Sequence, residues 1–237
     1  GAAAMTPVLV ADSIGKAFGG RAVLKSASLW LHAGTVTALM GRNGAGKSTL
    51  IRIAVGLLAP DYGTIRFHER LYTRTRLHVL ARQGLFYLPE RSLLSRSFTL
   101  REHARAFAPR ASRAEIEAVT DFLGITHVLD QYAEEISGGE RRRADLALAL
   151  LRRPACLIAD ELFLGITPKD AELIGAAIRR LTEQDGCAVL VTGHEIRTVL
   201  DVADDVAWLT AGTTHALGAP QAALAHDQFR REYLALR

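Results

Sequence analysis

The sequence predicts an α/β fold with a mostly parallel β-sheet at its centre and a helical subdomain inserted into the chain. Apolar runs of strand length alternate with helical patterns, which is typical of a sheet wrapped by helices. The runs are almost continuously apolar, as expected of strands that are buried on both faces. They are Thr35–Met40, Leu85–Leu88, Ala155–Ala159, Ala188–Val191 and Val206–Leu209.

The middle of the chain predicts helices and no strand. Its helical patterns are Thr99–Phe107, Ser112–Leu123 and Gly138–Leu151. A further helix is expected to begin at Pro168 and to end at Gly186, because proline suits the first turn and glycine the residue after the last. We therefore divide the chain into a first core segment (residues 5–90), a helical subdomain (91–152) and a second core segment (153–237).

Composition argues against several classes of protein. Hydrophobic residues make up 49% and charged residues 23%, as in an ordinary globular domain. The longest purely apolar stretch, Leu146–Leu151, is far shorter than the roughly 20 residues of a membrane span. We see no secretory signal, and we set Gly1–Ala4 aside as a cloning remnant. The expected location is cytoplasmic, with any membrane contact made through a partner.

Charge and cysteine content add little. The net charge of +4 is compatible with nucleic acid or an anionic membrane surface, but no basic tail or RNA-binding aromatic motif accompanies it. We interpret it as solvated surface and expect no nucleic-acid partner. Cys156 and Cys187 lie in apolar runs and are expected to be core residues without a disulfide.

The most specific motif follows the first parallel strand. Residues 41–48 read Gly-Arg-Asn-Gly-Ala-Gly-Lys-Ser and fit G-x-x-x-x-G-K-[ST] between the strand and a helical pattern at Ser48–Leu57. Glycines let successive backbone N–H groups point at phosphate oxygens, and the helix start adds its positive dipole end. Lys47 is expected on the β- and γ-phosphates and Ser48 on Mg²⁺. The motif predicts a P-loop NTPase core that binds ATP and Mg²⁺.

Two further motifs separate the possible NTPase types. Ser137-Gly138-Gly139-Glu140 precedes a long helical pattern, and alone it indicates only a glycine turn capped by Ser137. The buried strand at Cys156–Ala159 is followed by Asp160 and Glu161, and a buried strand seldom ends in two carboxylates unless a cation meets them. Asp160 suits Mg²⁺ coordination through water, and Glu161 suits proton abstraction from the attacking water.

Taken in order, these motifs and the Val-Leu-Val-Thr-Gly-His run ending at His194 resemble the ATPase subunits of ABC (ATP-binding cassette) transporters over Leu9–Leu234. The resemblance implies an N-terminal antiparallel β portion. It also implies a head-to-tail dimer that holds two ATP molecules, each between Gly41–Thr49 of one subunit and Ser137–Glu140 of the other. His194 would touch the γ-phosphate. The other histidines are read as surface or core residues.

The residues that the resemblance assigns to ATP are the phosphate-loop and Ser-Gly-Gly-Glu positions together with one aromatic residue. They are Phe18, Gly41, Asn43, Gly44, Ala45, Gly46, Lys47, Ser48, Thr49, Ser137, Gly138, Gly139 and Glu140. Phe18 would stack on adenine, and its alternative is ordinary core packing. The assigned Mg²⁺ ligands are Ser48, Glu90 and Asp160, and the catalytic residues are Glu161, His194 and Glu90.

Three positions depart from the family pattern. Glu90 stands where most members have Gln, Leu162 where Pro is usual, and Thr167 where the next interface loop has Asp. We expect activity to survive, because the expected site residues Lys47, Asp160, Glu161 and His194 are all present. The Ser-Gly-Gly-Glu-Arg-Arg-Arg run and the tail Phe229–Leu234 are similar to the branch that includes branched-chain amino acid importers and lipopolysaccharide export. The sequence leaves open whether Arg141–Arg143 do more than form a charged, solvent-exposed helix surface.

The predicted function is therefore that of an ATP-hydrolysing subunit that pairs with a second copy and drives an integral membrane permease, from the cytoplasmic face of the inner membrane. One alternative is an ABC ATPase without a transporter, acting on nucleic acid or a macromolecular assembly, although no second cassette, coiled-coil insertion or zinc site is seen. Another is a small-molecule P-loop kinase, which needs neither Ser137–Glu140 nor His194.

Overall fold

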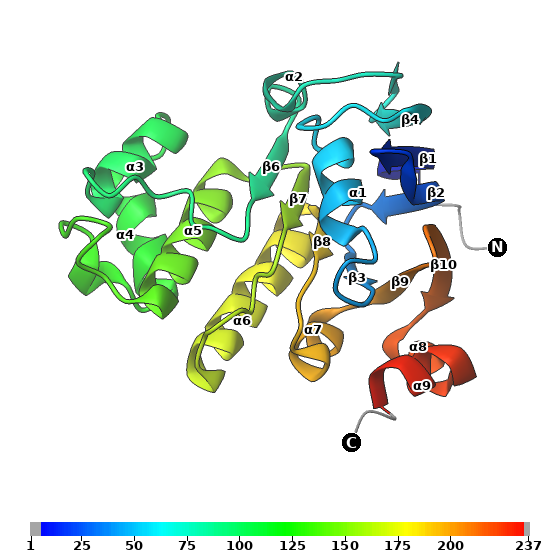
Figure 1. Cartoon of the computed structure of the whole chain (residues 1–237). Coiled ribbons are helices and arrows are strands. Elements are labelled where there is room, and N and C mark those ends of the chain that lie inside the picture. The colour runs from blue at the N-terminus through cyan, green and yellow to red at the C-terminus, as the bar shows by residue number, and fades with distance from the viewer. Residues whose placement is uncertain (1–5, 235–237) are drawn as a thin grey trace.

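The computed structural model describes residues 6–234 and has the predicted α/β architecture (Figure 1). The described strands form one mixed sheet in the order β5-β4-β1-β2-β10-β9-β3-β8-β7-β6. They are β1 (Pro7–Phe18), β2 (Arg21–His32), β3 (Val36–Met40), β4 (Tyr62–Phe67), β5 (Arg70–Tyr72), β6 (Leu85–Leu88), β7 (Cys156–Ala159), β8 (Ala188–Val191), β9 (Asp205–Thr210) and β10 (Thr213–Gly218). Residues 1–5 and 235–237 lie outside the described residues. They include Gly1–Ala4, which was set aside as a cloning remnant, and the outer ends of the two predicted core segments.

One half of the sheet is parallel. Strands β9, β3, β8, β7 and β6 pair in parallel with one another, in that order. All five predicted strands lie in this half, and each boundary agrees to within one residue. Side chains alternate between two cores: Leu157 and Ala159 enter one, Cys156 and Ile158 the other. Burial on both faces explains why these runs are continuously apolar.

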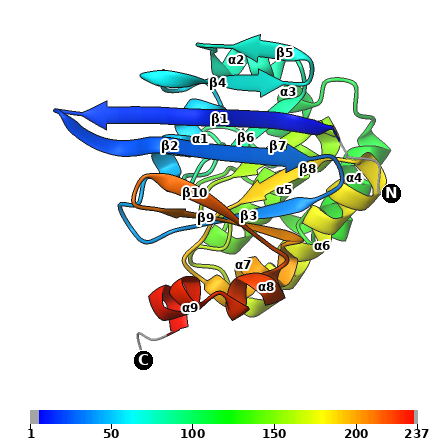
Figure 2. The same cartoon turned by 90° about the vertical axis from the view of Figure 1, so that its right-hand side faces the viewer.

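The other half confirms the N-terminal antiparallel portion. Strands β1, β2, β4 and β5 pair antiparallel, and the long β1–β2 ribbon crosses the molecule in Figure 2. Strand β10 runs antiparallel to β9 and meets β2 in parallel through Thr213 and Ser26. This contact joins the two halves into one sheet.

The helices cover both faces of the parallel half. Side chains of α1 and of the antiparallel strands fill one core, and those of α3 to α9 fill the other. The helices are α1 (Lys47–Ala54), α2 (Leu77–Ala81), α3 (Leu100–Phe107), α4 (Arg113–Phe122), the short 3₁₀ helix η1 (Thr126–Val128), α5 (Gly138–Arg152), α6 (Pro168–Asp185), α7 (Ile196–Val202), α8 (Pro220–Ala225) and α9 (Asp227–Leu234). None of the helices within residues 6–234 is both long enough and apolar enough to cross a bilayer.

The predicted helical subdomain is present between β6 and β7. In Figure 1 its helices α3, α4 and α5 lie to the left of the sheet. Each begins with a capping box, at Thr99, Ser112 and Ser137, in which a hydroxyl and a glutamate three residues later satisfy the first backbone N–H groups. Between residues 91 and 152 the only extended pairing described is an isolated bridge from Thr99 to Tyr132.

One predicted helix boundary is wrong. The pattern at Ser48–Leu57 suggested a helix to Leu57, but α1 ends at Ala54. Gly56 follows with a φ of 78°, and a Cβ there would lie 2.7 Å from the backbone carbon of Arg76. The close approach of a distant segment stops this helix, and apolar periodicity does not reveal it.

Two smaller predictions are confirmed. Helix α6 begins with Pro168 and ends before Gly186, which takes the left-handed conformation. Cys156 and Cys187 are both buried free thiols. In the C-terminal tail, the fully buried Phe229 packs against Trp208 with ring centroids 5.9 Å apart, which fixes α9 to the core.

Candidate active site

The phosphate loop, residues Gly41–Ser48, connects the end of β3 to α1. Gly46 has a φ of 106°, and a Cβ there would lie 2.9 Å from Leu24 Cδ2. A Cβ on Gly41 would lie 2.7 Å from the carbonyl oxygen of Leu209. These glycines are therefore needed for the path of the backbone as well as for its turn.

Helix α1 differs from the long helices of this chain in having no side-chain cap. Its N-cap residue is Gly46, whereas hydroxyls cap α3, α4, α5 and α6. The first N–H groups of α1 thus have no side-chain acceptor, and they coincide with the positive end of the helix dipole. This arrangement suits an anion with several oxygens, such as a phosphate group.

Lys47 is the first residue of α1 and is buried, with 8% of its surface exposed. Its Nζ donates hydrogen bonds to the carbonyl oxygens of Gly41 at 2.6 Å and Arg42 at 3.4 Å. Burial lowers the pKa of the Lys47 ammonium, and the carboxylates of Glu161 and Asp160 oppose the change. The ammonium is therefore held at the phosphate loop and in the field of the two carboxylates.

Asp160 and Glu161 follow β7 and are both buried. Glu161 has a φ of 52°, an uncommon value for a residue other than glycine, and strain of this kind clusters at functional sites. Glu161 Oε1 lies 3.2 Å from His194 Nε2, and its buried Oε2 has no hydrogen-bond partner among the described residues.

The surroundings of Glu161 alter its acidity. Burial raises the pKa of its carboxyl, and the negative charges of Asp160 and Glu90 add to the effect. His194 and Lys47 act in the opposite direction. A carboxylate with a raised pKa and an open acceptor oxygen is suited to accept a proton.

Thr192, after β8, was not singled out from the sequence although it lies in the run that ends at His194. Its Oγ1 donates to Asp160 Oδ1 at 2.8 Å and accepts from the backbone N–H of Glu161 at 2.9 Å. The fully buried hydroxyl therefore orients both carboxylate-bearing residues. The available sequence signal was a polar residue directly after a buried strand, next to another buried strand that is also followed by polar residues.

Replacing Thr192 with Val is expected to lower ATP hydrolysis about tenfold, the low end for loss of a residue that would orient the predicted Mg²⁺ ligand Asp160. Stability should fall by about 1–3 kcal/mol, because two buried polar groups lose a partner. Thr192→Ser keeps the hydroxyl and serves as the matched control. Steady-state phosphate release and thermal unfolding of the three proteins give the answer; equal loss in the Ser and Val variants would contradict the role of the hydroxyl.

The remaining predicted residues of this region are more exposed. Glu90 follows β6, and its charge is close enough to influence Glu161. His194 has 48% of its side chain exposed. Phe18 ends β1 with 49% exposure, and Lys16 Nζ lies 5.6 Å from its ring centroid. The solvent-facing ring is compatible with stacking on a base and does not fit the core-packing alternative.

Ser137–Glu140 lie on a different part of the molecule. The structure places them in the first turn and N-cap of α5, which Figure 1 shows across β6 and β7 from α1. Ser137 Oγ accepts from the N–H of Glu140 at 3.2 Å. A Cβ on Gly139 would lie 2.4 Å from Asp170 Oδ2, whereas space beside Gly138 is open. Within one chain, no described hydrogen bond or ion pair joins this segment to the phosphate loop.

Two departures from the family pattern have clear structural places. Leu162 is fully buried in the core that also holds Phe163. Thr167 caps α6, where its Oγ1 accepts from the N–H of Asp170 at 3.2 Å. Threonine therefore performs the capping task that an aspartate performs at such a position.

The donors around the phosphate loop fit Mg²⁺. The Ser48 hydroxyl and the Asp160 carboxylate are hard oxygen donors, and magnesium typically takes one or two protein ligands beside water and phosphate oxygens. No group of three or more His, Cys, Asp or Glu side chains able to hold a metal ion is found within residues 6–234.

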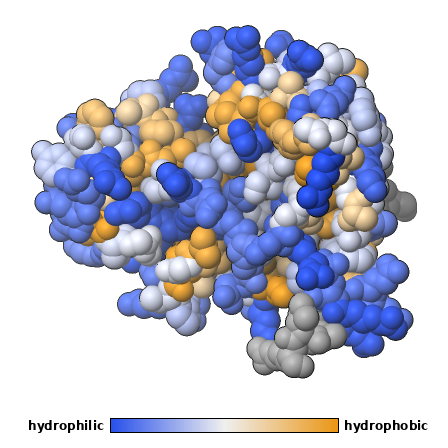
Figure 3. All heavy atoms as spheres, in the orientation of Figure 1, coloured by the Kyte–Doolittle hydropathy of each residue, from blue (hydrophilic) through white to orange (hydrophobic). Residues whose placement is uncertain are grey.

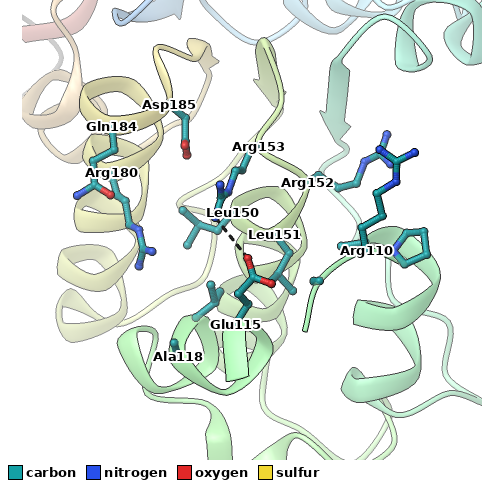
Figure 4. A pocket seen from close by; sticks show the side chains of 14 residues that line it. Arg110, Glu115, Ala118, Leu150, Leu151, Arg152, Arg153, Arg180, Gln184 and Asp185 are labelled. Atoms are coloured by element: carbon teal, nitrogen blue, oxygen red, sulfur yellow. Dashed lines mark ion pairs between the residues drawn. The ribbon is translucent and has the colours of Figure 1, made fainter. Parts of the chain in front are cut away.

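A cavity of about 980 Å³ lies away from this region (Figure 4). It is bounded by the loop after α3, by α4 and by the C-terminal ends of α5 and α6, and four arginines line it. Arg153 in it pairs with Glu115 at 3.5 Å, and Arg180 lies 5.2 Å from the ring of Phe122. None of the predicted site residues lines this cavity.

The known proteins that are similar to this chain are described as ATP-binding proteins of transport or export systems. A family model described as ABC transporter matches residues 24–163. A probable ABC transporter ATP-binding protein from Azorhizobium caulinodans is 35% identical over 95% of this chain and 82% of its own length. The lipopolysaccharide export system ATP-binding protein LptB of Haemophilus influenzae is 31% identical over 96% of this chain and 97% of its own.

Solved structures agree in fold. The ATP-binding subunit of an ABC transporter shares 26% identity with a TM-score of 0.77, covering 95% of this chain and 93% of that one. A nucleotide-free ATP-binding cassette from an ABC transporter has a TM-score of 0.84 at 23% identity, covering 96% and 99%. At that identity, the second likeness concerns the fold alone.

Proposed function

This chain belongs to the ABC transporter family, and from this premise we propose that it binds and hydrolyses ATP with Mg²⁺ as one of a pair of subunits that drives a membrane permease. The observation that carries the proposal is a buried lysine at an uncapped helix start, in the electrostatic field of two buried carboxylates. A positive cradle for phosphates and a proton acceptor thus lie side by side.

Triphosphate binding is assigned to the phosphate loop. The N–H groups from Gly44 to Thr49 supply hydrogen-bond donors, and Gly41 and Asn43 belong to the same curve of backbone. Lys47 adds a mobile charge for the β- and γ-phosphates. Phe18 offers an exposed face for adenine.

Hydrolysis is assigned to the carboxylate side of the site. Glu161 accepts the proton of the attacking water through its open Oε2, while Thr192 and Asp160 hold its backbone in place. Ser48, Asp160 and Glu90 supply oxygen ligands for Mg²⁺, which neutralises phosphate charge when bound. His194, 3.2 Å from Glu161, is positioned to donate toward the γ-phosphate.

Dimerisation is proposed because one chain separates two halves of the site. Ser137–Glu140 present a helix start with open space beside Gly138, and this end suits the γ-phosphate held by a second subunit. Leu164, in the loop after Glu161, is 50% exposed and gives an apolar contact for the partner. The proposed division of the chain into three segments agrees with this arrangement. The two core segments carry the phosphate loop and the two carboxylates, and the helical subdomain carries Ser137–Glu140.

A permease partner is proposed from the relatives and from the surface. Figure 3, in the orientation of Figure 1, shows hydrophobic residues in several separate groups on the face toward the viewer. On the helical subdomain, Phe98 and Tyr132 are about half exposed and adjacent, since Ala133 N donates to the carbonyl of Phe98. Exposed aromatic pairs are typical of protein interfaces. The chain would then work at the cytoplasmic face of the inner membrane, bound to its permease.

The purified chain with ATP and Mg²⁺, and without any acceptor, should release inorganic phosphate at a measurable steady-state rate. No phosphate release, together with ADP formation and transfer of the γ-phosphoryl group to an added small-molecule acceptor, would identify a kinase instead. Recovery of the chain with an integral membrane protein from detergent extracts is expected. Recovery with nucleic acid or ribosomes alone would favour an ATPase without a transporter.

A further inference from the structure

Arg142 is a buried arginine in the second turn of α5, with 7% of its surface exposed. It stands between two other arginines, in a charged run that would ordinarily lie on the solvent-exposed side of a helix. A guanidinium needs several acceptors when it is buried, because loss of hydration is costly for a charge. The identity of those acceptors therefore decides what this residue does.

The acceptors lie in the two core segments, across the subdomain boundary from Arg142. Arg142 Nη1 donates to the carbonyl of Pro89 at 3.1 Å, and Nη2 donates to the carbonyls of Glu90 at 2.6 Å and Glu161 at 3.4 Å. Pro89 and Glu90 lead from β6 into the helical subdomain, and Glu161 follows β7. One planar fork thus joins the Ser-Gly-Gly-Glu helix to both carboxylate-bearing segments.

Asp145, one turn further along α5, completes the arrangement. Its carboxylate lies 3.6 Å from Arg142 and is fully buried. Its Oδ1 accepts from Ser92 Oγ at 2.9 Å and from the N–H of Leu93 at 3.0 Å. The loop from Pro89 to Leu93 is therefore fastened to α5 at both ends, by Arg142 at its start and by Asp145 further on.

The two neighbouring arginines provide a contrast. Arg141 donates to the carbonyls of Ala133 and Ile136, inside the helical subdomain. Arg143 donates to the carbonyls of Leu123 and Gly124 and pairs with Asp170 of α6. Arg142 alone in this run reaches Glu90 and Glu161 among the described contacts.

We propose that Arg142 is a positioning residue for ATP hydrolysis: with Asp145, it makes the start of α5, the Glu90 loop and the Glu161 segment move as one unit. The inference rests on the proposed function and extends it. Arg142 touches no reacting atom; it sets where the backbone of Glu90 and Glu161 lies relative to Ser137–Glu140. Loss of this link should therefore impair the chemical step and leave binding to the phosphate loop intact.

The test uses the double variant Arg142→Met/Asp145→Leu, in which both buried charges are replaced by apolar groups of similar size. The carbonyls of Pro89, Glu90 and Glu161 lose their donor, so the unfolding temperature should fall moderately while the chain still folds. A purely structural role predicts normal activity in the folded variant. We expect unchanged binding of a fluorescent ATP analogue. We expect kcat to fall by about 10- to 100-fold with little change in KM, as for a small displacement of catalytic groups.

Amide hydrogen exchange gives a readout that does not need activity. In the double variant, exchange in residues 89–93 and 161–165 should be at least about tenfold faster than in the native chain, because local opening becomes easier. Arg141→Met is the matched control and should leave exchange in these segments unchanged. Arg142→Lys keeps a charge but lacks the fork; it replaces the double variant if that protein does not fold, and the same kcat loss is expected.

The outcomes separate the two proposals. A native chain that releases no phosphate overturns the proposed function, while the exchange experiment still decides whether Arg142 fastens the two segments. An active native chain whose double variant keeps its kcat within twofold, with unchanged exchange, overturns the role of Arg142. Faster exchange together with unchanged kcat also overturns it, since the link then has only a structural effect.

Discussion

Replacing Glu161 with Gln is expected to lower the rate of ATP hydrolysis by about 10²- to 10⁴-fold, the usual effect of removing a general base. The amide has nearly the shape of the carboxylate, and the hydrogen bond from the Glu161 backbone to Thr192 remains. Affinity for ATP should persist, because Lys47 and the loop backbone are unchanged. Steady-state phosphate release and equilibrium binding of ATP measure the two quantities separately.

Glu172→Gln, an exposed position on α6, is the matched control for the loss of one carboxylate and should keep the native rate. Equal hydrolysis by the native chain and by Glu161→Gln would show that Glu161 is a structural carboxylate. Its buried, unpartnered Oε2 would then have no catalytic explanation.

The same variant should also accumulate as a dimer. If ATP is bound but not consumed, the closed pair has no route to reopening by hydrolysis, so gel filtration with ATP and Mg²⁺ should show a species of twice the monomer mass. A monomer at saturating ATP and Mg²⁺ would count against pairing and against the assignment of Ser137–Glu140 to a neighbouring site.

Much of the fold followed from local pattern. The parallel strands are buried on both faces, and this burial produces the uninterrupted apolar runs from which they were predicted. The N-cap Ser137 and the first-turn Pro168 marked helix starts for reasons confined to one turn. The phosphate loop was found in the same way, because its glycines and lysine act within a few residues of each other.

The features missed from the sequence depend on contacts between distant segments. Thr192 joins Asp160 from 32 positions away, and Arg142 joins Pro89 from 53 positions away. For Thr192 the signal was weak, a polar residue after one of two neighbouring buried strands, and an arginine in a basic helical turn gives no signal of such a partner. The early end of α1 has the same origin, because Arg76 approaches Gly56 across the fold.

Replacing Lys47 with Met should nearly abolish hydrolysis and weaken ATP binding by about 10- to 100-fold, the loss expected for charge-assisted hydrogen bonds to phosphate. The fold should not suffer, because a flexible apolar chain replaces an ammonium whose burial lowers its pKa. Unfolding temperature and ATP binding by the isolated chain test both parts. Lys169→Met, at an exposed position in the first turn of α6, is the matched control and should bind ATP normally.

The two parts of this expectation fail in different ways. A Lys47→Met chain that binds ATP as tightly as the native protein would mean that the nucleotide is held elsewhere, since Lys47 begins α1 and its Nζ reaches back across the phosphate loop to Gly41. A chain that unfolds at much lower temperature would mean that the hydrogen bonds from Nζ to Gly41 and Arg42 hold the loop together. Intact folding with lost binding is the combination that only a phosphate-binding lysine produces.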